Sequence, residues 1–391
     1  MADPVRFPIS NAVTGNCFTL ALSVGSQAVP MNVLLDTGSS MTVVYADPYD
    51  PGSDTMAATT RLMQSGSFGD SGRFVAGLVR TRVALPTENR AAILGQANLG
   101  VVRGVGPSPF GKVDGILGLA YPALNSAVTM PGDTWANRYT AAQLGQGQPA
   151  GDLPTCLDQL VAAGSFNDTF ALAVRRSFAS QADDGAAAER LNAGVFVLGG
   201  GEACTDLYTG DFVSVAVVHE AYYNTNLISV QVGDRTIQVQ PTRAGDAAGS
   251  NSFIDSGDPG LTLDSGLYQQ VIGLFNAVDP TFGPALQAVV CDQTQLDLAR
   301  WPTLRFVLQG SGGAPVTLTV EPRDYWQFDG YGAGTARAVL DTGGAPYPGQ
   351  SILGLPLLAG RYAVFDRGPG GGNSVIKFAA QPDANAAPLV A

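Results

Sequence analysis

Residues 33–40 read Val-Leu-Leu-Asp-Thr-Gly-Ser-Ser, and the interpretation of the whole chain depends on this stretch. Three apolar residues lead directly into an acid, a hydroxyl residue and a glycine, which is the pattern of a buried strand ending in a tight turn. A carboxylate there is costly to bury unless donors meet it, and Thr37, Ser39 and the Gly38 N–H are the nearest. Because Asp, Thr and Gly are also ordinary turn residues, the stretch gains weight only if a second carboxylate has the same setting.

The second half of the chain repeats this arrangement. Residues 252–257 read Ser-Phe-Ile-Asp-Ser-Gly, again with apolar residues before an acid, a hydroxyl residue and a glycine. In each half an Ile-Leu-Gly run follows at a similar interval, at 116–118 and at 352–354. Paired motifs, one set per half, indicate a duplicated lobe. We therefore expect an N-terminal lobe over residues 1–188 and a C-terminal lobe over residues 189–391.

A third copy of the local pattern lies at residues 339–344, which read Val-Leu-Asp-Thr-Gly-Gly. It precedes Ile352 by only a few residues, so no partner run follows at the interval that the other two copies share. We interpret Asp341 as an acid in a loop that takes no part in the pair.

Composition favours an all-β, two-lobed chain. Of its 391 residues, 45% are apolar, which is enough for a large core, and 49 glycines and 25 prolines divide the sequence into short runs. The best helical pattern lies at 156–163, where apolar residues share one face. Residues 122–151 resemble an irregular insertion, and the polar stretch 179–190 is the expected hinge between halves.

Charge and residue counts exclude several classes of function. The net charge is −12 and there are only two lysines, which argues against binding nucleic acid or an anionic membrane. The single histidine, His219, rules out a His-rich metal site and would have to serve any Ser-His-Asp hydrolase. The four cysteines have no CxxC spacing, so they form up to two disulfides or remain buried thiols. We expect no metal and no cofactor.

The ends of the sequence leave the location open. No apolar run has transmembrane length, and the N-terminus lacks the apolar core of a signal peptide. The protein is cytoplasmic if Met1 is native, and secreted or periplasmic if the chain is a processed, mature form. We expect a monomer.

Two such carboxyl groups support a specific chemistry if a pseudo-twofold axis brings Asp36 and Asp255 together. Two carboxylates within hydrogen-bond range cannot both ionise cheaply, so they share a proton. The ionised acid draws a proton from a water molecule between them, while the protonated one polarises a carbonyl group. Water then attacks an amide without a covalent intermediate. The alternative is that both acids only cap turns at strand ends.

These motifs make the chain resemble a pepsin-family aspartic endopeptidase. Residues 36–40 and 114–121 are similar to the motifs of that family's N-terminal lobe, and residues 351–354 and 361–367 to the end of its C-terminal lobe. The resemblance implies a bilobal β fold, a peptide substrate bound in a cleft, and a hairpin flap over that cleft. It also implies the following residue roles: Asp36 and Asp255 are catalytic; Thr37, Gly38, Ser39, Ser256, Gly257 and Asp258 support the active-site loops, with Thr37 and Ser256 locking them together; Phe68, Gly69, Asp70 and Ile116 belong to the flap and the substrate pockets.

Three positions depart from the pattern of the family. Asp258 stands where a hydroxyl residue usually bonds the second catalytic acid, and like-charge repulsion from it would raise the pKa values of the pair. We therefore expect a raised pH optimum or weakened activity. The flap has Phe68 for the usual Tyr, and Val43 stands for its usual Trp partner, so the flap would close by apolar packing. The cysteines do not match the family's usual pairs.

Two rival interpretations remain. A catalytically weak or inactive binding or inhibitor protein on the same fold fits the irregular sequence of residues 255–259. An unrelated β-rich hydrolase or adhesin requires both motif pairs to match by accident.

Overall fold

The computed structural model describes residues 3–67, 73–85, 93–103, 110–164, 166–180, 190–242, 249–368 and 373–382. The strands of the first half are β1 (Val5–Ser10), β2 (Thr19–Val24), β3 (Val29–Asp36), β4 (Thr42–Tyr45), β5 (Ala58–Ser67), β6 (Arg73–Leu85), β7 (Ile93–Val102), β8 (Gly115–Gly118), β9 (Ser126–Thr129), β10 (Gln148–Asp152) and β11 (Thr169–Val174).

The strands of the second half are β12 (Ala193–Leu198), β13 (Thr209–Ala216), β14 (His219–Glu220), β15 (Tyr223–Thr225), β16 (Leu227–Val232), β17 (Arg235–Gln238), β18 (Ser252–Ile254), β19 (Leu261–Leu263), β20 (Cys291–Asp292), β21 (Leu304–Gln309), β22 (Pro315–Val320), β23 (Trp326–Phe328), β24 (Thr335–Ala338), β25 (Leu340–Thr342), β26 (Ser351–Leu353), β27 (Arg361–Asp366) and β28 (Val375–Ala380). The α-helices are α1 (Thr134–Asn137), α2 (Cys156–Ala162), α3 (Ser265–Val278), α4 (Phe282–Gln287), α5 (Pro322–Tyr325) and α6 (Leu355–Leu358).

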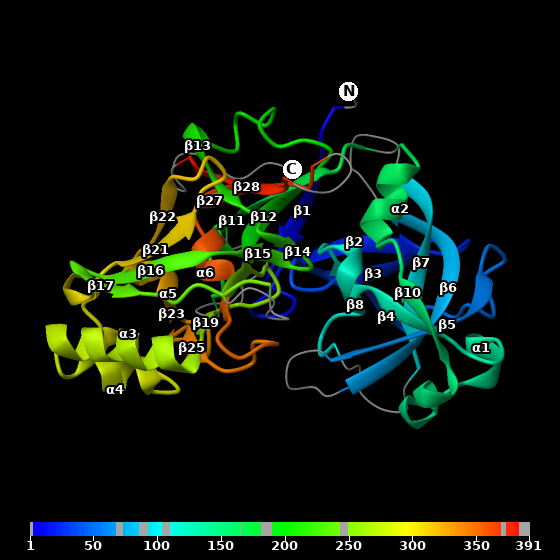
Figure 1. Cartoon of the computed structure of the whole chain (residues 1–391), viewed down its shortest axis with the longest axis horizontal. Helices are drawn as coiled ribbons and strands as arrows, with labels where there is room; N and C mark the ends of the chain where they lie inside the picture. The colour runs from blue at the N-terminus through cyan, green and yellow to red at the C-terminus, as the bar shows by residue number, and fades with distance from the viewer. Residues whose placement is uncertain are drawn as a thin grey trace.

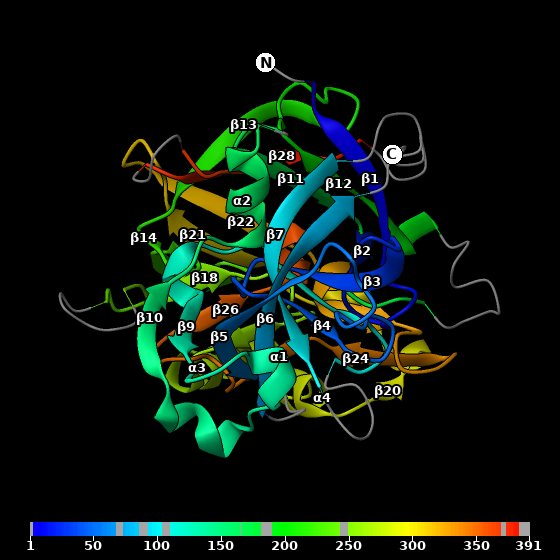
Figure 2. The same ribbon diagram turned by 90° about the vertical axis from the view of Figure 1, so that its right-hand side faces the viewer.

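The chain forms two bodies, one from each half, and the all-β prediction is confirmed (Figure 1). The N-terminal body, in blue and cyan, carries β2 to β10, and the C-terminal body, in green to orange, carries β14 to β26. Seen from the side of the N-terminal body, the long strands β6 and β7 cross its face, with the C-terminal body behind them (Figure 2). Residue 188, the expected boundary between lobes, lies outside the described residues.

The same strand topology occurs in both halves. In the first half the order of hydrogen-bonded neighbours is β2-β3-β8-β4-β7, and in the second it is β15-β18-β26-β19-β25. The directions agree as well: β3–β8 and β18–β26 are parallel, β4–β8 and β19–β26 are antiparallel, and β4–β7 and β19–β25 are parallel. The duplication inferred from the paired motifs therefore extends to five strands in each half.

A shared sheet joins the two bodies. Its strands run β1-β12-β11-β27-β28-β13, so segments from both ends of the chain lie side by side. Phe170 on β11 stacks on Phe365 on β27, with 4.8 Å between ring centroids, and both rings are fully buried. This aromatic packing supplies a dry base to which each body is attached.

Some local predictions need correction. The helix expected at 156–163 is α2, but residues 122–151 are not irregular throughout, because β9, α1 and β10 form there. The longest helix, α3, was not anticipated. Asp264 caps its N-terminus, and Leu267, Val271, Ile272 and Phe275 form its buried face. Most of the expected hinge, residues 181–189, lies outside the described residues.

Candidate active site

The Asp36 carboxyl group lies at the end of a buried strand. Residues 33–35 of β3 are buried and pair in parallel with β8, which fixes the backbone of Asp36 in the sheet. The following turn supplies hydrogen bonds to the acid: the Gly38 N–H donates to Oδ1 (2.8 Å) and the Ser39 hydroxyl to Oδ2 (2.5 Å). Two of the three expected donors therefore bind Asp36, while the side chain of Thr37 is used elsewhere.

Asp255 occupies the corresponding place in the C-terminal body. It directly follows β18, which pairs with β26 as β3 pairs with β8. The Gly257 N–H donates to Asp255 Oδ1 (2.7 Å), which repeats the contact between Gly38 and Asp36. The position that corresponds to Ser39 is Asp258, so the second acid has no equivalent of the hydroxyl donor that binds Asp36.

The two loops are tied together by reciprocal hydrogen bonds. The Thr37 hydroxyl donates to the Ile254 carbonyl oxygen (3.0 Å) and accepts from the Ser256 N–H (2.8 Å). In return, the Ser256 hydroxyl donates to the Leu35 carbonyl oxygen (2.8 Å) and accepts from the Thr37 N–H (3.1 Å). Both side chains are buried, so these bonds are shielded from water.

The carboxyl groups of Asp36 and Asp255 lie close enough together for each to contribute to the shifted pKa of the other. Glycine is required on both sides of the pair. A β-carbon at Gly38 would overlap the Asp255 carboxyl group, and one at Gly257 would lie 2.5 Å from Asp36 Oδ1. The glycines of the two Asp-x-Gly triplets therefore allow each loop to approach the acid of the other.

The surroundings favour one shared proton. Loss of hydration raises the pKa of Asp36, although hydrogen bonds from Ser39, Asp255 and Gly38 partly oppose that shift. Loss of hydration also raises the pKa of Asp255, and repulsion from Asp36 and Asp258 raises it further. Asp36 is therefore the acid that ionises more easily, and Asp255 is the acid that more readily keeps the shared proton.

Asp258 does not take the place of the missing hydroxyl. Its carboxylate turns into its own loop, where Oδ1 accepts from the Gly260 N–H and Oδ2 from the Thr262 hydroxyl, both at 2.8 Å. Burial is the main cause that raises the pKa of Asp258, with smaller contributions from Asp341 and Asp36. Asp258 therefore acts on Asp255 through its charge and makes no hydrogen bond to it that would orient the carboxyl group.

An apolar wall lies beside the Asp36 loop. Ile116 on β8 is buried in a cluster whose other members come from the strands around β3, the flap hairpin and the segment before β8. The hairpin expected to be the flap corresponds to β5 and β6, and its tip, with Phe68, Gly69 and Asp70, lies outside the described residues. The buried cluster members are Cys17, Leu34, Val43, Tyr45, Phe74, Ala76, Val102, Phe110, Val113 and Ile116.

Two residues near the acids, Cys17 and Tyr222, and the neighbouring Tyr223 were not anticipated from the sequence. The Cys17 thiol donates to the Gly257 carbonyl oxygen (3.3 Å) and so contacts the opposite loop. Tyr222 is close enough to the pair that the charges of Asp255 and Asp36 contribute to its raised pKa, after burial and Tyr347. Tyr223 is fully buried and donates to the Leu119 carbonyl oxygen (2.8 Å). The adjacent Tyr222 and Tyr223, just before and at the start of β15, could have been noticed in the sequence, because neighbouring residues of a strand face opposite sides of the sheet.

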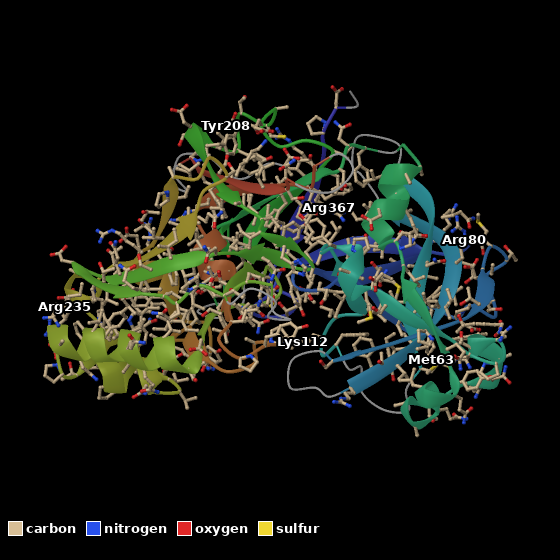
Figure 3. The ribbon with its side chains drawn as sticks, viewed as in Figure 1. Met63, Arg80, Lys112, Tyr208, Arg235 and Arg367 are labelled. Atoms are coloured by element: carbon tan, nitrogen blue, oxygen red, sulfur yellow. The ribbon has the colours of Figure 1, made fainter. Side chains whose placement is uncertain are left out.

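A buried arginine ties α2 of the N-terminal body to the shared sheet. Arg367 follows β27 and lies where the two bodies meet (Figure 3). Its guanidinium is 2.7 Å from Asp158 and 3.2 Å from Asp168, and it lies 5.0 Å from the ring centroid of Tyr121. The side chain of Arg367 is only 2% exposed, so the ion pairs are scarcely screened by solvent.

The remaining residues singled out in the sequence lie away from the acid pair or form no special site. His219 is exposed on β14, and the four cysteines are free thiols. Asp341 belongs to β25, a strand and not the expected loop, and is exposed beside Arg337 (3.5 Å). In the part of the chain that the structure describes, no helix is long and apolar enough to cross a membrane.

A family model described as eukaryotic aspartyl protease matches residues 185–381. This half of the chain contains Asp255 and the C-terminal strands of the shared sheet. The chain belongs to this pepsin-like family of aspartyl proteases. The family is one of peptide hydrolases, and its substrates are peptides and proteins.

Proposed function

We propose that the protein is an aspartic endopeptidase in which Asp36 and Asp255 activate a water molecule against a peptide bond. The observation that carries this proposal is the meeting of two acids at corresponding strand ends, with their loops cross-linked by Thr37 and Ser256. Such a cross-link has a clear purpose in catalysis, because acid–base groups must hold their mutual position while a proton moves.

The hydrogen bonds support different roles for the two acids. Asp36 accepts from the Gly38 N–H and the Ser39 hydroxyl, so it is suited to be the ionised base that removes a proton from water. Asp255, with the more strongly raised pKa, is suited to hold the shared proton and polarise the carbonyl oxygen of the peptide. Attack by the water oxygen gives a tetrahedral intermediate, and its collapse with proton delivery to nitrogen breaks the C–N bond.

The proposed pH optimum lies above the range set by unperturbed carboxyl groups. Activity requires one proton on the pair, so it falls when both acids are protonated and again when both are ionised. Loss of hydration raises the pKa of each acid, and Asp258 adds to the shift of Asp255. Both limits of the active range therefore move upward, the upper one further.

A second candidate is a catalytically weak or inactive member of the family that binds peptides or inhibits proteases. The specific observation in its favour is Asp258, which leaves Asp255 without a hydroxyl donor such as Ser39 gives to Asp36. In that case the cleft would retain a peptide without cleaving it.

Digestion of an unfolded protein and a peptide library from about pH 3 to about pH 8 tests the proposal. An endopeptidase cleaves both, and a statine-type mimic of the tetrahedral intermediate blocks cleavage. The proposal is wrong if no pH gives inhibitor-sensitive cleavage; saturable binding of the mimic without cleavage would instead identify the second candidate.

A further inference from the structure

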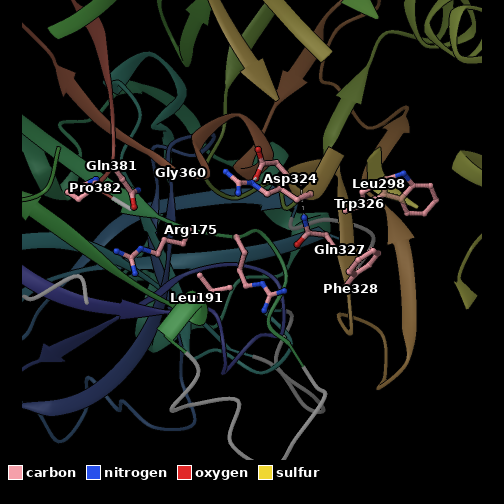
Figure 4. Close-up of a pocket in the computed structure, with 12 residues that line it drawn as sticks. Arg175, Leu191, Leu298, Asp324, Trp326, Gln327, Phe328, Gly360, Gln381 and Pro382 are labelled. Carbon is pink, nitrogen blue, oxygen red and sulfur yellow. Dashed lines mark hydrogen bonds and ion pairs between the residues drawn. The ribbon is translucent and has the colours of Figure 1, made fainter. Parts of the chain in front are cut away.

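A cavity of about 600 Å³ lies outside the two Asp loops, where the shared sheet meets α5 and β23 (Figure 4). Most of its lining residues come from three distant parts of the chain: the segment after β11, the segment that includes α5 and β23, and the segment after β28. Leu191, Leu298 and Gly360 complete the described part of the lining. The volume is within the range of pockets that hold small organic ligands.

Among the described residues that line this cavity, positive charge dominates. Arg175 and Arg176 come directly after β11, and Arg323 is on α5. Asp324 is the one acid among the 12 described residues that line it. Three guanidinium groups around one cavity are notable in a chain whose net charge is −12. Guanidinium groups bind carboxylates through paired N–H donors, so an organic carboxylate fits this lining.

The same cavity has an apolar side, and the side chains of Trp326 and Gln381 each place in it a buried polar atom that has no partner among the described residues. Trp326 and Phe328 contribute aromatic surface, and Leu191 and Leu298 add aliphatic surface. Trp326 is 2% exposed, and its indole N–H has no hydrogen-bond acceptor in the described structure. A buried donor of this kind is costly unless a ligand supplies an acceptor.

Gln381 provides a buried hydrogen-bond acceptor, which complements the indole donor of Trp326. Its Nε2 donates to the carbonyl oxygens of Val174 (2.8 Å) and Arg361 (2.6 Å), which fixes the orientation of the amide. Its Oε1 is buried and has no donor in the described structure. A ligand that satisfies this oxygen must carry an N–H or O–H group.

We propose that this cavity binds the C-terminal end of a peptide, namely an N-acylated apolar amino acid with a free α-carboxylate. The carboxylate meets the arginines, the amide N–H meets Gln381, and the apolar side chain packs against Trp326 and Phe328. Peptides of this kind are also the products of peptide hydrolysis, so the site can sense them, but binding there does not depend on the proposed activity.

Binding of N-acetyl-L-phenylalanine, measured by isothermal titration calorimetry, tests the site. We expect saturable binding with a Kd of about 1 mM or tighter, and at least about tenfold weaker binding of N-acetyl-L-phenylalanine amide, which lacks the carboxylate. We also expect 3-phenylpropanoate, which lacks the amide N–H, to bind several-fold more weakly. Equal affinity for the acid and its amide, or no saturable binding of the acid, would overturn the proposal.

Charge variants locate the binding. Arg323 has an exposed side chain, so Arg323→Gln leaves the packing intact, and we expect it to weaken binding by about threefold or more. Arg176→Gln should weaken it by about tenfold. The matched control is Arg235→Gln, an exposed arginine at the far end of the C-terminal body, which should change nothing (Figure 3). Unchanged affinity in both pocket variants would place the ligand elsewhere and refute the site.

Substitution of Asp324 should change the affinity in the opposite direction to the arginine substitutions. Burial raises the pKa of Asp324 to about 6. The charge of Glu321 also raises this pKa, whereas the hydrogen bond from the Glu321 N–H and the charges of Arg323 and Arg361 lower it. At pH 7.5 Asp324→Asn removes a negative charge from the lining and should tighten binding, whereas at pH 5 the acid is largely protonated and the variant should behave like the wild type. A structural disturbance would weaken binding at both pH values, and that result would contradict the proposal. Measuring these affinities also in Asp36→Asn separates the cavity from peptide hydrolysis.

Discussion

Thr37 and Ser256 hold each other's loop through four hydrogen bonds, two made by each hydroxyl group. Each side chain donates to the strand that precedes the opposite acid and accepts from the backbone N–H of the opposite hydroxyl residue. The separation of Asp36 and Asp255 is therefore determined by a network that belongs to both bodies, and neither loop can move alone without breaking buried hydrogen bonds.

Removing one hydroxyl should weaken both stability and activity. Thr37→Val leaves the Ser256 N–H and the Ile254 carbonyl oxygen unpaired in a buried setting, so we expect the free energy of unfolding to fall by about 1–3 kcal/mol. Urea unfolding and kcat measure the two effects. Thr37→Ser keeps the hydroxyl and is the control; if it loses as much activity as Thr37→Val, the hydrogen bonds are not the cause.

Because the two loops lie so close together, adding a single methyl group at Gly38 should impair catalysis. In Gly38→Ala the new β-carbon overlaps the Asp255 carboxyl group, so the two acids must separate. A displacement of about 1 Å can reduce a rate about 100-fold, and we expect kcat to fall at least that far. Gly145→Ala is the matched control, because a β-carbon at Gly145 meets open space. A nearly normal kcat in Gly38→Ala would show that catalysis does not require Asp36 and Asp255 to lie as close together as they do in the structure.

Asp258 should determine the upper pH limit of activity. Its negative charge disfavours ionisation of Asp255 and so raises the pKa of that acid. Asp258→Thr removes the repulsion, and the pKa of Asp255 then falls. Since activity is lost when the second proton leaves the pair, the alkaline limb of the pH–rate profile should move to lower pH. An alkaline limb that stays in place or moves upward would contradict this role of Asp258.

Arg367 should contribute far more to stability than an exposed ion pair. Arg367→Met leaves Asp158 and Asp168 without their buried cation, and loss of one partner of a buried pair typically costs about 3–5 kcal/mol. Arg6→Met breaks a more exposed contact with Asp206, for which we expect a loss of at most about 1 kcal/mol. Chemical denaturation of both variants measures the difference. Equal losses would mean that the buried ion pairs of Arg367 stabilise the fold no more than the exposed pair of Arg6 does.

The duplicated core could be predicted from the sequence because its motifs are local. An apolar run that ends in an Asp-hydroxyl-Gly triplet predicts an acid at a strand end, and the two paired copies of the motif show this, at Asp36 and at Asp255. Asp341 shows the limit of such local reasoning. Its triplet matches as well, but β25 occupies the place of β7 in the duplicated topology, not that of β3. Strand order separates the copies, in agreement with the missing interval to an Ile-Leu-Gly run.

Other features depended on contacts that the sequence does not reveal. Cys17 reaches Gly257 across a separation of 240 residues, and no local pattern indicates that contact. The orientation of Asp258 depends on Thr262, which turns the carboxylate away from Asp255. Helix α3, in contrast, could have been predicted, because Asp264 caps it and apolar residues recur at helical spacing along it.

The most direct test compares three Asp→Asn variants in the same peptidase assay. Asp36→Asn and Asp255→Asn should each lose about 1,000-fold or more in kcat/KM, because each removes one member of the proton-sharing pair. Asp341→Asn changes the third Asp-hydroxyl-Gly triplet, which lies on an exposed strand, and should stay within about twofold of the wild type. Substantial activity in Asp36→Asn or Asp255→Asn, or a large loss in Asp341→Asn, would contradict the assignment of Asp36 and Asp255 as the catalytic pair.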